Sequence, residues 1–134
     1  MKEILRVSNP LMESANRLQE LMAEERDSQM ASGYHKRLIQ WINDFHKSLG
    51  DDYEAGACLV NFGQQVTFHI NDIGYRNPAL ISFVGTTEDG APVELIQHVN
   101  QLSILLMKLK RKEPETPKRP IGFASWEEYE ESKE

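Results

Sequence analysis

Apolar and polar residues alternate strictly over residues 66–71, and this alternation is the strongest constraint on the fold. The alternating residues are Val66, Thr67, Phe68, His69, Ile70 and Asn71. A period of two residues is typical of a β-strand with one buried face. Further strands are predicted at 57–62, 80–85 and 93–97, and Glu88-Asp89-Gly90 is typical of a hairpin turn. The sequence therefore predicts an antiparallel sheet over about residues 54–110.

Residues 102–109 are the ambiguous part of this sheet. The run is short and nearly continuous in apolar residues, and its leucines would also suit one face of a helix. Periodicity alone does not separate a buried strand from a buried helix in so short a run. We favour a fifth strand and keep a helix as the alternative, so that the predicted sheet has four or five strands.

Two helices are predicted before the sheet, at about 10–30 and 34–48, separated by Ser32-Gly33. The second helix carries a wide apolar stripe with two large aromatic residues, and such a stripe requires a packing partner. The fold class is therefore α+β, with the N-terminal helices packed on one face of the sheet. Apolar residues of the first helix recur at spacings of three and four: Leu11, Ala15, Leu18 and Met22. The expected core residues are Trp41, Phe45, Phe68, Phe83, Leu95 and Leu106.

The chain is predicted to form a single domain over residues 1–112, followed by a linker and a tail. Residues 113–120 contain three prolines, which favour an extended linker. Residues 121–134 form an acidic tail, in which Ser125 and Glu128 have the spacing of a capping box that begins a short helix. Trp126 and Tyr129 lie on one side of that helix, so they are candidate residues for contact with a protein partner.

Charge, cysteine content and hydropathy argue against several classes of protein. The chain has 15 lysine and arginine residues against 21 acidic residues, a net charge of −6, so nucleic acid is not an expected partner. The short apolar runs do not predict a membrane-spanning helix. The single cysteine, Cys58, excludes an internal disulfide, and the absence of an export signal predicts a cytoplasmic protein. No pattern of catalytic residues is evident, so we expect a protein that is not an enzyme and has no cofactor or metal.

Polar residues gather where the predicted strands end. The candidate ligand-binding residues are His69, Asn71, Tyr75, Arg76, Asn100 and Arg119. In a pocket at one end of the sheet, the tyrosine would stack on a base and the two arginines would bind phosphates. The histidine and the asparagines would form hydrogen bonds. The alternative interpretation is ordinary turn and sheet-edge polarity.

A metal-dependent hydrolase is a minor alternative. His69, Asp72 and His98 would converge if the second and fourth strands were neighbours in the sheet. Two imidazoles and a carboxylate are an acceptable ligand set for an open metal site. Their spacing is long and irregular, so hydrogen bonding within the sheet is the preferred interpretation.

Five sequence strings resemble a known family. They are GACLVNFG at 56–63, VTFHINDIGY at 66–75, ISFVG at 81–85, LIQHVNQLS at 95–103 and IGF at 121–123. Over about residues 34–123 the chain resembles a small prokaryotic and phage family of domains of unknown function, which implies no activity. In size, α+β build and expected oligomer it is also similar to the phage Thoeris anti-defence proteins. That general likeness implies a non-enzymatic protein that sequesters a cyclised ADP-ribose signal between subunits.

We therefore expect a non-enzymatic binding protein of prokaryotic or phage origin. Its expected ligand is a small nucleotide-derived molecule, such as an immune signalling molecule. The alternative is a protein–protein interaction module, an adaptor or an inhibitor, that acts through the first helix and the tail residues Trp126 and Tyr129. A single sheet does not fully cover the apolar side of the first helix, which favours a homo-oligomer, with a dimer as the expected state.

Overall fold

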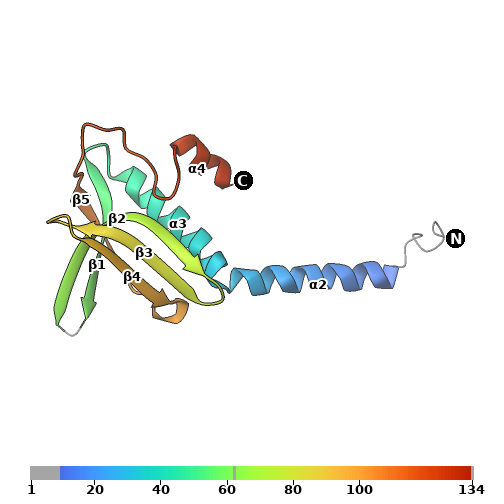
Figure 1. The fold of residues 1–134 in the computed structure, drawn as a ribbon. Helices are drawn as coiled ribbons and strands as arrows, with labels where there is room; N and C mark the ends of the chain where they lie inside the picture. Colours follow the sequence, from blue (N-terminus) through green and yellow to red (C-terminus); the bar gives the residue numbers. More distant parts are fainter. Residues whose placement is uncertain (1–9, 62, 134) are drawn as a thin grey trace.

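The computed structural model describes residues 10–61 and 63–133, and it shows an α+β fold built on a five-stranded antiparallel sheet (Figure 1). The spatial order of the strands is β4-β3-β2-β1-β5, so the last strand returns to pair with the first. The predicted fold class is thereby confirmed. Among the helices of the described residues, none is both long and apolar enough to span a membrane. In chain order the elements are α2 (Pro10–Ser28), α3 (Ala31–Ser48), β1 (Tyr53–Asn61), β2 (Gln64–Arg76), β3 (Leu80–Thr87), β4 (Pro92–His98), the 3-10 helix η1 (Val99–Gln101), β5 (Leu105–Lys110) and α4 (Trp126–Ser132).

The ambiguous run at 102–109 contains a strand, as the favoured prediction stated. The 3-10 turn η1 ends at Leu102, and β5 then pairs with β1 in antiparallel register from Cys58↔Leu105 to Tyr53↔Lys110. A helix at this position would have left β1 as an exposed edge, because β2 pairs only with its other side. The sheet therefore has five strands, the upper of the two predicted numbers.

Helix α3 covers one face of the sheet and forms the main core with it. Ile39 and Ile42 of α3 pack with Ala55 and Ala57 of β1 and with Phe68 of β2. The two alanines are small, so they allow the helix to approach β1 closely. Phe83 is also fully buried, whereas Phe45, Leu95 and Leu106 are only partly buried against the core cluster.

The prediction that Trp41 belongs to the core is wrong, because 73% of its surface is exposed. The buried face of α3 contains Ile39, Ile42, Asn43 and His46. Successive residues of a helix are about 100° apart, so this face is rotated away from the apolar stripe that includes Trp41. The helix therefore buries two polar side chains and leaves its largest aromatic residue at the surface.

The break between the two helices also differs from the prediction. It lies at residues 29–30, and Ser32 and Gly33 are inside α3. The elbow is fixed, since Ala31 N donates to Pro78 O at 2.8 Å and Arg37 Nη2 donates to Ser28 O at 2.8 Å. Gly33 is required there because a Cβ atom would lie 2.5 Å from Ser28 O. Helix α2 consequently projects away from the sheet, and none of its residues is buried (Figure 1). Both N-terminal helices were expected to pack on the sheet, but only α3 does so.

The close pairing of β2 with β3 predicts that Gly85→Ala destabilises the fold. A Cβ atom at Gly85 would lie 2.0 Å from His69 O and 2.7 Å from a ring atom of Phe68. Overpacking of this kind costs about 1 to 3 kcal/mol. Chemical denaturation should show this loss, whereas Val84→Ala, at the neighbouring exposed position, should change the free energy of unfolding by less than about 1 kcal/mol. Equal stability of the two variants would contradict the packing described here.

Candidate ligand-binding cleft

A C-terminal segment, residues 111–124, crosses from β5 to α3 and forms one wall of a cleft. We call this segment the strap. Asn43 of α3 is fully buried and bonds both backbone groups of one strap residue. Its amide Nδ2 donates to Ile121 O at 2.9 Å, and its Oδ1 accepts from Ile121 N at 2.7 Å. Ile121, the first residue of the expected tail, enters the core cluster, and Pro120, the last residue of the expected linker, is buried beside it.

His46, one helical turn after Asn43, joins the strap to the sheet. Its Nδ1 accepts from Ala55 N at 3.0 Å, and its Nε2 donates to Arg119 O at 2.9 Å. This pair of contacts needs the neutral imidazole with hydrogen on Nε2. Burial, followed by the nearby charges of Lys118 and Arg111, lowers the pKa of His46 from 6.5 to about 4, although the Arg119 carbonyl opposes this shift.

The tail packs against α3 through the two aromatic residues that the sequence suggested for partner contact. Tyr129 is fully buried, and its hydroxyl lies 2.9 Å from both Gln40 O and Asp44 Oδ1. Trp126 is half-buried, and its Nε1 donates to Lys118 O at 2.9 Å. Burial and the Asp44 carboxylate raise the pKa of Tyr129. Both aromatic side chains therefore serve intramolecular packing in this structure.

The cleft between the strap and the sheet has a volume of about 760 Å³. Its sheet side includes Glu54 of β1, Asn71 and Asp72 of β2, and Thr86 of β3. The β2–β3 register shifts between Ile70 and Asp72, where Asn71 and Asp72 both line the cleft. The volume lies within the range of about 300 to 1,000 Å³ that is usual for small-molecule sites.

The strap side of the cleft is strongly basic. It contributes Arg111, Lys112, Lys118 and Arg119 to the lining, together with the acidic Glu113. Three of these cations donate to neutral oxygens: Arg111 to Asp51 O, Lys112 to Thr86 Oγ1, and Lys118 to Gly50 O. Such bonds position the side chains without cancelling their charge. Burial, followed by the charge of Arg111, lowers the pKa of Lys118, although the carboxylates of Asp51 and Glu54 oppose this shift.

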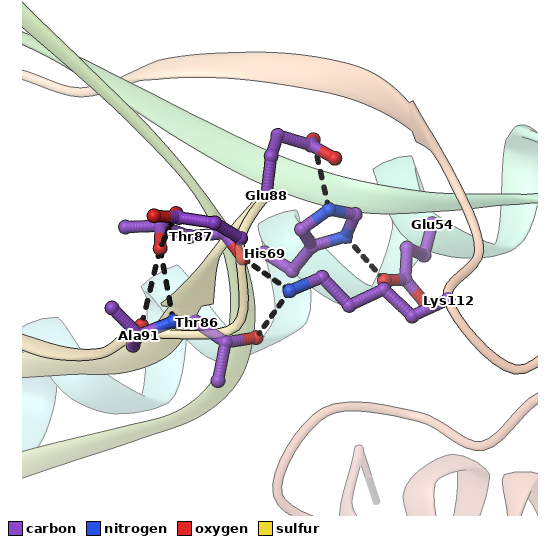
Figure 2. Close-up of polar contacts among 8 residues, drawn as sticks. Glu54, His69, Thr86, Thr87, Glu88, Ala91 and Lys112 are labelled. Carbon is purple, nitrogen blue, oxygen red and sulfur yellow. Dashed lines mark hydrogen bonds and ion pairs between the residues drawn. The ribbon is translucent and has the colours of Figure 1, made fainter.

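His69 lies behind the cleft, between two carboxylates (Figure 2). It is 2% exposed; its Nδ1 bonds Glu54, and its Nε2 lies 3.0 Å from Glu88 Oε1. Lys112 reaches across the same region to Thr86 and Thr87 of β3 (Figure 2). Both ring nitrogens of His69 are thus occupied by partners within the chain. The imidazole bonds Glu54, which lines the cleft, and is not itself among the lining residues.

The six predicted ligand-binding residues do not form one pocket. Asn71 and Arg119 line the cleft, and His69 supports it from behind. Tyr75 packs on His35 of α3 with ring centroids 4.9 Å apart, and Arg76 and Asn100 lie near the far ends of β2 and β4. Sequence reasoning missed Arg111, Lys112, Lys118 and Phe123 as lining residues. The signal for the three basic residues was that six lysines and arginines fall within residues 108–119. The position of Phe123 depends on the fold of the strap.

The positions of the histidines do not support the predicted alternative of a metal site. The alternative required neighbouring second and fourth strands, but β3 lies between β2 and β4. His69 is held by Glu54 and Glu88, and His98 caps η1 by accepting from Asn100 N at 3.1 Å. Across the part of the chain that the structure describes, no group of three or more histidine, cysteine or acidic residues is placed to hold a metal ion.

The sheet, the single helix packed on it and the strap define an α+β domain with a polar cleft. The chain belongs to a family of unknown function, DUF6173, whose family model matches residues 26–124. The match runs from the last residues of α2 to the end of the strap, so the elements that form the cleft all lie within the family domain. The expected resemblance to a family of domains of unknown function is thereby confirmed. Comparisons with curated proteins and with solved structures gave no match.

Replacing Asn43 is expected to release the strap. In Asn43→Ala, the N–H and C=O groups of Ile121 lose their buried partners, at a cost of about 2 to 4 kcal/mol. Trypsin should then cleave after Lys118 faster than in the wild type, and chemical denaturation should show the lost stability. Gln40→Ala, on the same helix, is the control and should leave the cleavage rate unchanged. Equal cleavage rates in all three proteins would rule out the role assigned to Asn43.

Acid is expected to weaken the junction at His46. Because the folded state holds this imidazole neutral with a pKa of about 4 against 6.5, the unfolded chain binds more protons between these values. Stability is therefore complete above the unfolded value and falls as the pH drops, by about 2 kcal/mol from about pH 7.5 to pH 5. Denaturation of wild type and His46→Gln at both pH values isolates this contribution from those of the other titrating groups. A pH dependence unchanged by the substitution would contradict the prediction.

Proposed function

We propose that this protein is a non-enzymatic binding protein that holds a small, nucleotide-derived anion in the cleft beneath the strap. The observation that carries the proposal is the basic wall of Arg111, Lys112, Lys118 and Arg119, three of which donate to neutral oxygens. An anion entering the cleft would meet charges already held in place, so less conformational entropy would be lost on binding. Arginine in particular suits phosphate oxygens, because its planar guanidinium group offers paired donors.

The sheet side of the cleft supports a nucleotide rather than a bare phosphate. Asp72 uses Oδ1 to accept from Ile73 N at 2.8 Å, and its second oxygen is available to accept a ribose hydroxyl. Asn71 is exposed and offers both a donor and an acceptor. Phe123, from the strap, is an aromatic residue of the lining and packs on Tyr129 with ring centroids 5.4 Å apart. Phosphates would thus bind the strap, and the nucleoside would bind the sheet side.

The proposed biological setting is a prokaryotic or phage protein that acts in the cytoplasm. A prokaryotic or phage protein that sequesters a signalling nucleotide must bind it without converting it. The basic strap residues and the polar sheet residues of the cleft are suited to such binding. Cys58 is a free, buried cysteine, which suits a protein of the reducing cytoplasm. The alternative function, an interaction module, is favoured by the exposed apolar side of α2; the tail residues are engaged with α3.

The proposal is tested by calorimetric titration at low salt with ADP-ribose, AMP and inorganic phosphate. The wild type is expected to bind ADP-ribose more tightly than inorganic phosphate. Arg119→Ala should weaken the affinity for ADP-ribose by about tenfold or more, because a charged hydrogen bond contributes about 1.5 to 3 kcal/mol. The Arg119 side chain is exposed, so this substitution should not disturb folding.

Arg76→Ala is the matched control, since it also removes one exposed arginine but lies outside the cleft. Its affinity should stay within about twofold of the wild type, well below the effect of one charged contact. Failure of all three compounds to bind would overturn the proposed ligand class. An equal loss of affinity in Arg76→Ala and Arg119→Ala would overturn the proposed location.

A further inference from the structure

One helix does not cover the face of the sheet on which α3 lies. Five strands about 4.8 Å apart make a sheet about 20 Å wide, whereas a helix with its side chains is about 10 Å across. The uncovered part lies on the flank of α3 opposite the strap contacts. There a groove of about 470 Å³ runs between α3 and the residues leading into β5. Its main apolar lining residues are Leu38, Trp41, Phe45, Leu102, Ile104 and Leu106.

One wall of the groove is the apolar stripe of α3 that was predicted to lie in the core. Leu38, Trp41 and Phe45 recur at spacings of three and four, so they share one flank of the helix. Leu38 and Phe45 are only half-buried, and Trp41 is 73% exposed. The aromatic residues Trp41 and Phe45 would lose much water-exposed surface if another element lay in the groove.

Helix α2 has an exposed apolar side that the core of its own chain does not cover. Leu18, Leu21 and Met22 are each between 52% and 58% exposed. With 19 residues, α2 is about 28 Å long, similar to the 18 residues of α3 beside the groove. Because the elbow bonds at Ala31 and Arg37 hold α2 away from the sheet (Figure 1), α2 does not reach the groove of its own chain.

The charges of the two surfaces also match. α2 contains five acidic residues against two arginines. α3 and β5, which flank the groove, together contain five lysine and arginine residues against one aspartate. One of the five, Lys47, lies on the tail side of α3, 3.6 Å from Glu130, which leaves four near the groove side. Lys108 shares the sheet face of Leu106, since the two are separated by one residue in β5. An acidic helix laid along this groove would therefore meet a basic rim.

We propose that the groove is occupied by α2 of a second copy of this chain, in a reciprocal exchange that forms a closed dimer. Each copy contributes one helix and one groove, so the contact occurs twice under two-fold symmetry. The exchange gives the sheet the second covering helix that it lacks and covers the apolar side of α2 in the same step. This proposal is independent of the ligand cleft, which lies on the strap side of α3.

The test measures the mass of the full chain by light scattering after gel filtration, for the wild type and three single variants. Leu18→Glu places a charge on the apolar side of α2, and Ile104→Glu places one in the groove. Both are expected to be monomers at concentrations where the wild type is a dimer. Asn16→Glu is the matched control: it adds the same charge about 160° around the helix from Leu18, so it should remain a dimer. Circular dichroism confirms that the variants are folded.

Mixing the two monomeric variants tests directly whether α2 of one copy binds the groove of the other. Leu18→Glu retains an intact groove and Ile104→Glu retains an intact helix, so an equimolar mixture should form a heterodimer through one unaltered contact. A wild-type monomer would overturn the proposal. So would a dimer lost only in Leu18→Glu, which would indicate that two α2 helices pair with each other, or a mixture that stays monomeric.

Fluorescence offers an independent readout of the groove. In a Trp126→Phe background, Trp41 is the remaining tryptophan. Its quenching by acrylamide should decrease as the protein concentration rises and the groove fills, and the Leu18→Glu substitution should abolish that decrease. Quenching that is independent of concentration in a protein shown to be dimeric would place the interface elsewhere and overturn the assignment.

Discussion

Two hydrogen bonds between the Asn43 amide and the backbone of Ile121 hold the C-terminal strap against α3. The cleft exists because the strap is held there, and α4 then packs Tyr129 onto the same helix. A backbone segment buried without partners would lose more free energy than it gains from packing Ile121. The buried Asn43 amide, together with the His46 contact to Arg119 O, therefore makes residues 111–124 a wall of the domain.

The strands were predictable because their periodicity is a local property. Apolar and polar residues alternate from Val66 to Asn71 because successive side chains of a strand point to opposite faces. The alternation did not predict the burial of His69, nor the register shift between Ile70 and Asp72 after which β2 continues to Arg76. The burial of Asn43 and His46 was not predictable in this way. Their partners, Ile121, Ala55 and Arg119, are remote in sequence or lie in another element, and no helical pattern reports them.

Trp41 shows a second limit of prediction from a hydrophobic pattern, which identifies an apolar surface but not what covers it. The stripe that contains it correctly identified an apolar flank of α3, but it could not specify whether that flank is covered within one chain or by another. The elbow illustrates a similar ambiguity, since Gly33 was interpreted as a helix breaker. In the structure it permits close contact with Ser28 inside the first turn of α3. Of the proposed site, Asn71 and Arg119 were foreseen, and their proximity depends on the path of the strap.

The pairing of β5 with β1 has a consequence for biosynthesis. The register joins Tyr53 to Lys110, and residues 62–104, about a third of the chain, separate the two strands. While the chain emerges from the ribosome, β1 can pair with β2 on one side, but its other edge stays open until residue 110 is available. Open strand edges promote aggregation, and late long-range pairing slows folding. The cleft, which needs both β5 and the strap, is consequently among the last parts of the molecule to form.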